Sequence, residues 1–189
     1  GDIVVVAGFS KATVADTLCD PSVTEPIPAM PIDPPTLTMT FFVNTSPLAG
    51  KSGKKLTSRM IGERLFKEAE TNIALKVEQS ENNEAFEVSG RGELQLGILI
   101  ETMRREGFEL SVSRPRVVMI ENENGEKLEP IEDVVIDVDD EFSGVVIEKM
   151  TKRKATITEM KASGGGKTRI VFSAPSRGLI GYLSEFRTD

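Results

Sequence analysis

The chain has 189 residues, enough for one or two domains of ordinary size. It has no histidine and one cysteine, which excludes a Ser-His-Asp triad, imidazole or thiolate metal sites and an internal disulfide. The net charge of −7 argues against a general nucleic-acid binder. No apolar run approaches the roughly 20 residues that span a bilayer, and no signal-peptide pattern opens the chain. These features predict a cytoplasmic protein without membrane or DNA partners.

The first 33 residues are too short for a core of their own. Residues 3–7 (Ile-Val-Val-Val-Ala) predict a buried strand. Residues 21–35 contain six prolines, which exclude a helix and indicate an extended linker. We interpret residues 1–33 as the last strands of one domain followed by a linker.

Residues 34–113 predict the element order β-α-β-β-α-β. Alternating apolar residues at Leu37, Met39 and Phe41 indicate a half-buried strand. Apolar residues three or four positions apart, as at Ile61 and Leu65, indicate a helix. The remaining elements are expected as strands at 73–77, 86–88 and 108–112 and as a helix at 96–103. This order is that of the ferredoxin-like, or split βαβ, fold.

Residues 127–189 repeat most of this order as β-α-β-β-α, after a linker at 114–126. Asn124-Gly125 is a strong hairpin signal, because both residues accept positive φ. Strands are expected around 134–138, 157 and 170–174, and helices at 145–150 and 177–186. Similar heptapeptides at 97–103 and 144–150 favour a duplication, although chance similarity of two amphipathic helices is the alternative. The fold class is therefore α+β, with tandem ferredoxin-like domains.

Two segments imitate a nucleotide-binding loop. Gly50-Lys51-Ser52 and Gly166-Lys167-Thr168 have the end of the pattern, but its first glycine is replaced by Thr45 and Lys161. We exclude both as nucleotide sites. The first segment remains a candidate anion-binding loop before a helix, with a flexible solvent loop as the alternative. The surrounding cations are either a phosphate-binding face or a solvated one: Lys51, Lys54, Lys55 and Arg59.

A second candidate contact is the turn at Ser176-Arg177. Ser176 is a credible N-cap, but Arg177 in the first turn is unfavourable for the helix dipole. The mismatch suggests that Arg177 faces a phosphate or a carboxylate, and a tolerated exposed arginine is the alternative. No pair of carboxylates is marked by an apolar context, so we predict no catalytic residue and no metal site. A small acyl-phosphate hydrolase is a further alternative, but the loop after Asn44 has no arginine before Arg59.

Four segments carry a resemblance to a known family. The longest is Ser89-Gly90-Arg91-Gly92-Glu93-Leu94-Gln95-Leu96, which continues to Gly107. Residues 44–51, 57–59 and 176–182 are the others, and residues 1–4 and 16–19 add to them. Together they resemble the BipA/TypA family of translational GTPases, which are related to elongation factor G. Gln95 departs from the histidine frequent there in the family.

The resemblance implies the rest of the expectations. Residues 1–33 would end a β-barrel second domain. Residues 34–113 and 127–189 would correspond to the third and fifth domains of elongation factor G, the latter incomplete. The parent protein would bind GTP and Mg²⁺, hydrolyse GTP on the ribosome, and act in translation, large-subunit assembly and stress response. This fragment would not be an enzyme and would hold no cofactor.

In this picture the fragment contacts ribosomal RNA and ribosomal proteins through the two candidate surfaces named above. Phosphate contacts would give affinity and position without sequence choice. The alternative function is a regulatory module that binds a small molecule between tandem ferredoxin-like domains.

Overall fold

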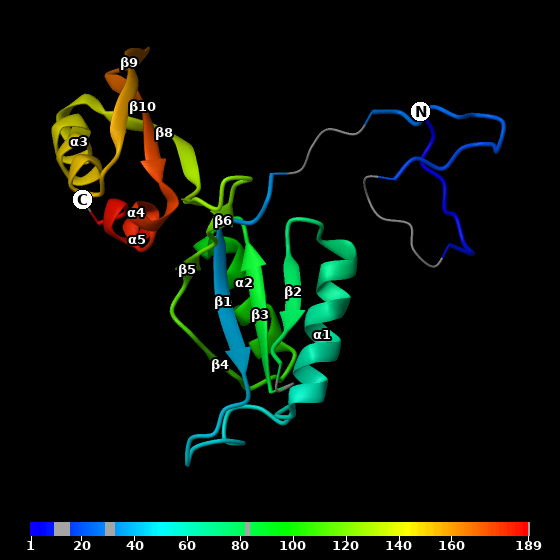
Figure 1. Ribbon diagram of the computed structural model, residues 1–189. Coiled ribbons are helices and arrows are strands. Elements are labelled where there is room, and N and C mark those ends of the chain that lie inside the picture. Colours follow the sequence, from blue (N-terminus) through cyan, green and yellow to red (C-terminus); the bar gives the residue numbers. More distant parts are fainter. Residues whose placement is uncertain (10–15, 29–32, 82–83, 189) are drawn as a thin grey trace.

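A computed structural model describes residues 1–9, 16–28, 33–81 and 84–188 (Figure 1). Beyond the N-terminal segment, the chain forms two modules, each with helices packed on an antiparallel sheet. We call residues 37–117 the first module and residues 131–186 the second module. None of the helices described here is long and apolar enough to cross a membrane.

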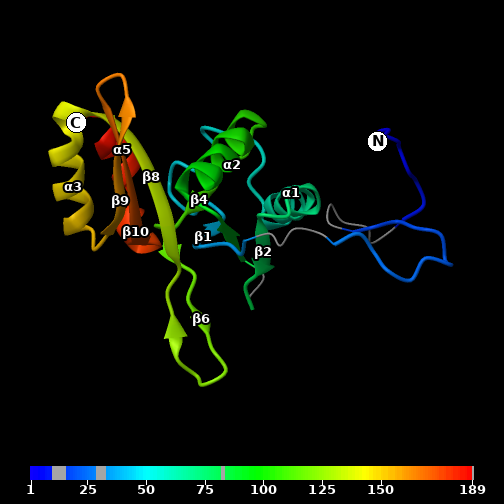
Figure 2. The same cartoon turned by 90° about the horizontal axis from the view of Figure 1, so that it is seen from above.

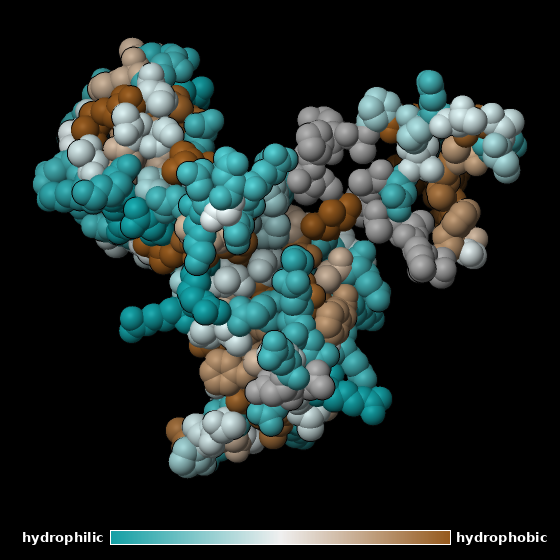
Figure 3. All heavy atoms as spheres, in the orientation of Figure 1, coloured by the Kyte–Doolittle hydropathy of each residue, from teal (hydrophilic) through white to brown (hydrophobic). Residues whose placement is uncertain are grey.

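The strand expected at residues 3–7 is wrong. These residues form no strand and are exposed, Ile3 and Val5 completely so, and apolar patches mark the N-terminal segment in Figure 3. The physical reason is that a strand needs a neighbour for its backbone groups, and none of the described segments supplies one here. Residues 10–15 and 29–32, the latter within the proline-rich linker, lie outside the described residues.

The first module has the ferredoxin-like topology. Its sheet has the order β2-β3-β1-β4, with β1 antiparallel to both of its neighbours. Both helices lie on the same side of this sheet (Figure 2). The elements are β1 (Leu37–Phe42), α1 (Ser58–Thr71), β2 (Lys76–Gln79), β3 (Ala85–Gly90), α2 (Glu93–Arg105) and β4 (Ser111–Val112). The predicted order β-α-β-β-α-β is confirmed.

The last strand of this sheet continues into the predicted linker. After β4, β5 (Arg116–Val117) pairs with the other half of β1. Pro115, which has no N–H, lies at the break between the two, as expected for an edge strand. The Ser113 hydroxyl accepts from the Thr40 N–H at 2.9 Å and so completes the ladder there. The sequence predicted a linker at 114–126, because an edge strand interrupted by a proline has the same local sequence features as a loop.

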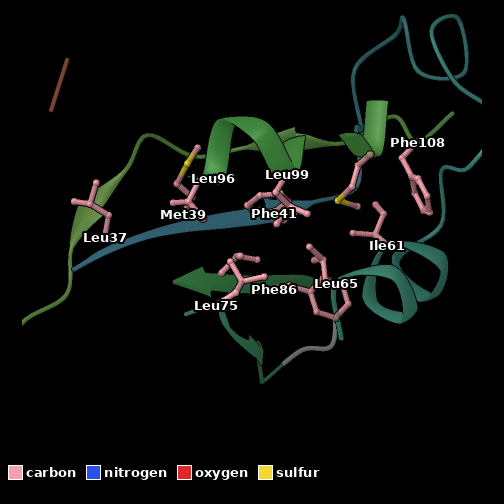
Figure 4. Packing of buried hydrophobic residues seen from close by; sticks show 12 residues of the cluster. Leu37, Met39, Phe41, Ile61, Leu65, Leu75, Phe86, Leu96, Leu99 and Phe108 are labelled. Atoms are coloured by element: carbon pink, nitrogen blue, oxygen red, sulfur yellow. The ribbon is translucent and has the colours of Figure 1, made fainter. Parts of the chain in front are cut away.

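The core of the first module is built by the predicted alternation. Phe41 of β1 is completely buried, as are Ile61 and Leu65 of α1. Figure 4 shows their side chains directed toward one another beneath those of α2. The buried cluster consists of Leu37, Met39, Phe41, Ile61, Leu65, Leu75, Phe86, Val88, Leu96, Leu99, Met103 and Phe108.

Helix α1 begins at a side-chain cap. The Thr57 hydroxyl accepts from the Met60 N–H at 3.3 Å and satisfies one of the donors that the first turn leaves unpaired. We expect Thr57→Ala to lower the free energy of unfolding by about 1 kcal/mol, measured by urea denaturation, whereas Thr57→Ser should lower it much less. Equal losses in the two variants would contradict the capping role.

The second module has the sheet order β8-β10-β9. Its elements are β8 (Ile131–Asp139), a 3₁₀ turn (Asp140–Phe142), α3 (Ser143–Lys152), β9 (Thr156–Gly164), β10 (Lys167–Pro175), α4 (Ser176–Leu179) and α5 (Tyr182–Phe186). The predicted order β-α-β-β-α is confirmed, except that the last helix is broken. Gly181 has φ +77°, a left-handed conformation that interrupts the helix predicted over 177–186.

Two details of the predicted duplication are wrong. The similar heptapeptides lie on α2 and α3, which are the second helix of one module and the first helix of the other. They therefore do not occupy equivalent places. The glycine that begins each heptapeptide, Gly97 or Gly144, also has no shared packing role, because a Cβ added at either position would meet no atom within 4 Å. The predicted hairpin does form, from β6 (Ile120–Glu121) and β7 (Lys127–Leu128), and projects from the body in Figure 2.

Candidate anion-binding surface

The basic loop, residues 44–55, connects β1 to α1 and is organised by one carboxylate. One Glu109 oxygen accepts from the Asn44 amide at 2.8 Å and from the Gly50 N–H at 2.9 Å. Its other oxygen accepts from the N–H groups of Ser52 and Gly53 at 2.8 and 3.0 Å. Glu109 is buried, and these bonds, above all those from Gly50 and Ser52, hold the pKa of its carboxyl below the usual value.

This arrangement corrects one expectation from the sequence. The amides of Gly50, Ser52 and Gly53 were candidates to bind an external phosphate. They are occupied by Glu109, a carboxylate of the chain itself. The loop is consequently not an open phosphate cradle, and its backbone is held by contacts within the chain.

The four predicted cations of the basic loop differ in their surroundings. Lys51 and Lys54 are exposed and make no ion pair or side-chain hydrogen bond within the ranges that the structure describes. Lys55 is half-buried, and its Nζ lies 4.6 Å from the centroid of the Phe108 ring. Arg59 pairs with Glu63 at 2.8 Å, but both side chains are largely exposed. Arg59 can therefore readily exchange Glu63 for another anionic partner.

More cations continue this surface along α1. Arg64 donates to Glu106 at 2.7 Å and to Glu68 at 2.8 Å. The pKa of Glu106 is lowered, first by its bond with Arg64 and further by the charges of Lys55 and Lys67. Glu106 is thus bonded to Arg64 and feels the charges of Lys55 and Lys67, and we include Lys67 in the surface although it was not among the four predicted cations. We call Lys51, Lys54, Lys55, Arg59 and Lys67 the basic surface.

The turn at Ser176-Arg177 is a different environment. Ser176 is 1% exposed, and its hydroxyl donates to Glu132, so it is not available at the surface. It is the first residue of α4, and the N-cap is Pro175 instead. Arg177 donates to Glu129 at 2.7 Å. The expectation that Arg177 faces a phosphate or carboxylate is met by a carboxylate of the same chain.

The two most specific sequence motifs meet where the modules touch. Glu93, at the start of α2, accepts a 2.7 Å hydrogen bond from the N–H of Gly181, and Ile180 packs against the core of the first module. Gln95 accepts from the Arg91 N–H at 2.7 Å and secures the start of the same helix. No local sequence signal indicates the contact between Glu93 and Gly181, because it joins residues 88 positions apart.

Neither phosphate-loop imitation fits a nucleotide. The first is filled by Glu109. In the second, Gly166 belongs to the tight turn between β9 and β10, and Lys167 and Thr168 begin the strand β10 instead of a helix. A cluster of three or more residues suited to hold a metal ion does not occur in the part of the chain that the structure describes. GTP and Mg²⁺ are therefore not assigned to any residue of this chain.

Comparison with known proteins places the chain. Residues 126–189 match the family described as Elongation factor G C-terminus. Over the whole chain, 50% of residues are identical to Large ribosomal subunit assembly factor BipA of Salmonella typhimurium and of Escherichia coli. The Bacillus subtilis protein of that name is 49% identical over 98% of the chain. A solved structure from Thermus thermophilus aligns over 88% of this chain and 40% of its own, with 12% identity and a TM-score of 0.48.

The chain spans about a third of these relatives, 31% of the Salmonella protein and 30% of the Bacillus protein. Identity of about one residue in two extends over both modules, and the motifs at residues 89–107 and 176–182 lie at their junction. The chain therefore belongs to the BipA/TypA family, of which it represents a part with two ferredoxin-like modules.

Proposed function

We propose that this chain is the ribosome-contacting part of a BipA-type translational GTPase, and that the basic surface binds phosphates of ribosomal RNA. The observation that carries the proposal is the pair of exposed lysines, Lys51 and Lys54, on a loop whose backbone is fixed by an internal carboxylate. The names of the relatives, which describe an assembly factor of the large ribosomal subunit, support the choice of partner.

The remaining family properties belong to the parent protein. We assign hydrolysis of GTP, with Mg²⁺, to a part of the parent other than this segment, since neither of the two loops that imitate a nucleotide-binding motif fits a nucleotide. Its roles in translation, large-subunit assembly and stress response, and its cytoplasmic location, follow from the same assignment. The domain limits 34–113 and 127–189 are part of the proposal, and the pairing of β5 with β1 extends the first unit to residue 117. The Ser176 hydroxyl is left out, because it is buried.

The experiment measures binding of the chain to purified large ribosomal subunits by sedimentation at several salt concentrations. Phosphate contacts release counterions, so affinity should fall as salt rises. A plot of log affinity against log salt concentration has a negative slope. In the double variant Lys51→Ala/Lys54→Ala, this slope should become less steep by about 2, because each lost phosphate contact reduces its magnitude by about 1.

A charge-matched variant, Lys152→Ala/Lys161→Ala, is the control. Both lysines are exposed and pair with neighbouring acids, Glu148 and Glu159. We expect this control to retain the slope of the unaltered chain. Equal loss of slope in both double variants would show a diffuse charge effect and would contradict the proposed surface.

A further inference from the structure

We infer that Glu109 is a positioning residue for the basic surface: it acts as an internal anion that fills the loop's own amide cradle and holds Lys51 and Lys54 ready for phosphate. This inference rests on the proposed function, and it adds the residue that holds the lysine-bearing loop in an ordered conformation.

The first step is the completeness of the Glu109 contacts. Its two oxygens receive four hydrogen bonds, all from the basic loop, and three of these come from backbone N–H groups. A buried carboxylate satisfied in this way is stable in its charged form. Because N–H groups of the loop stabilise this charge, no lysine ammonium group among the described residues pairs with Glu109, and Lys51 and Lys54 remain available to an external anion.

The C-terminal end of the loop, from Gly53 to Lys55, is anchored a second time through its backbone. The N–H groups of Lys54 and Lys55 both donate to the Gly107 carbonyl at 3.1 Å. The Glu109 N–H donates back to the Lys55 carbonyl at 3.2 Å. At Gly53 the approach is so close that an added Cβ would lie 2.8 Å from the Gly107 oxygen. The loop is thus joined to the connection between α2 and β4.

An anchored loop backbone should lower the cost of binding a partner through Lys51 and Lys54. Lys51 lies between Gly50 and Ser52, and Lys54 follows Gly53, so each lysine has a neighbour bound to Glu109. Ordering a flexible cationic loop on a partner would cost free energy, and a loop that is already ordered avoids part of that cost. The lysine side chains keep their freedom, whereas the backbone that presents them does not.

The sign of the effect separates positioning from simple electrostatics. Glu109→Gln removes a negative charge near the lysines, so electrostatics alone would tighten binding to RNA. Positioning predicts the opposite, because the glutamine NH2 must face backbone N–H donors in either orientation, at Gly50 or at Ser52 and Gly53, and so loosens the loop. We expect affinity for large ribosomal subunits to fall about tenfold, from the cost of ordering the loosened loop backbone on the RNA. The salt slope should be unchanged, since the same phosphates are contacted.

One control variant and one measurement of loop structure accompany the binding experiment. Glu101→Gln makes the same change of charge at a residue of α2 that lies outside the buried core and pairs with Arg104 and Arg105, and it should bind no more weakly than the unaltered chain. Hydrogen exchange of the free chain should show protection lost at Gly50, Ser52 and Gly53 in Glu109→Gln, while the core strands β1 and β3 stay protected.

The outcomes are distinct. If Lys51→Ala/Lys54→Ala lowers the salt slope but Glu109→Gln binds as tightly as the unaltered chain or more tightly, the inference is overturned while the proposed function stands. Unchanged amide protection in the loop of Glu109→Gln also overturns it. If the unaltered chain shows no salt-dependent binding, the proposed function fails and this inference fails with it. Weaker binding at an unchanged slope, with loop protection lost, supports the inference.

Discussion

Replacing Gly178 with alanine should destabilise the second module by about 3 kcal/mol. The new Cβ would lie 2.3 Å from the backbone carbonyl oxygen of Arg153, and a backbone atom cannot turn aside as a side chain can. The Arg153 guanidinium also donates to the carbonyls of Gly178 and Ile180 at 2.8 and 3.1 Å. A shift of the turn away from the clash would therefore break these bonds as well.

The matched control is Gly144→Ala in α3. A Cβ there meets nothing within 4 Å, and alanine is favoured over glycine in a helix, so stability should be unchanged or rise by up to about 1 kcal/mol. Both variants are compared by urea denaturation of the intact chain. A loss for Gly178→Ala no larger than the change for Gly144→Ala would show that the approach of Arg153 is not tight in solution.

The second large effect is expected at the centres of the two cores. Phe41 and Phe172 are each completely buried, the first in the core of the first module and the second in that of the second. Phe41→Ala and Phe172→Ala should each cost about 3–5 kcal/mol. Because the two cores are separate clusters, each variant should lose amide protection mainly in its own module.

Phe142→Ala provides the comparison, since Phe142 is 40% exposed and lies in the 3₁₀ turn outside both buried clusters. Its cost should stay below about 1.5 kcal/mol. Hydrogen exchange followed by mass spectrometry resolves the two modules within one sample. Equal loss of protection in both modules for Phe41→Ala would mean that they unfold as one unit, against the description of two cores.

Local signals in the sequence predicted most of the fold. The alternation at Leu37, Met39 and Phe41 became β1, and the helical spacing of Ile61 and Leu65 became the buried side of α1. Such signals succeed because a period of two or 3.6 residues is fixed by the geometry of the element itself. They failed at residues 3–7, where an apolar run has no strand beside it in the described structure.

The candidate site was harder to predict, because its organisation depends on contacts between distant residues. The lysines at 51 and 54 were proposed from the local cluster of cations in a loop before a helix and from the family resemblance of that loop. Glu109, which orders them, lies in an alternating strand pattern where an outward-facing acid is ordinary, and it bonds to residues 56 to 65 positions away. The mismatch of Arg177 with its helix dipole correctly indicated an acidic partner, yet the identity of Glu129 required the fold.

The most direct test of the basic surface is a photo-crosslinking comparison on the ribosome. The exposed Cys19 is first replaced, Cys19→Ser, so that a short cysteine-reactive probe attaches only where intended. The probe is then placed at Lys51→Cys or, as control, at Lys161→Cys on β9 of the second module. If the basic surface contacts ribosomal RNA, the probe at position 51 should form discrete crosslinks to RNA of the large subunit, and high salt should reduce their yield. Crosslinks from position 161 but not from position 51 would contradict this contact.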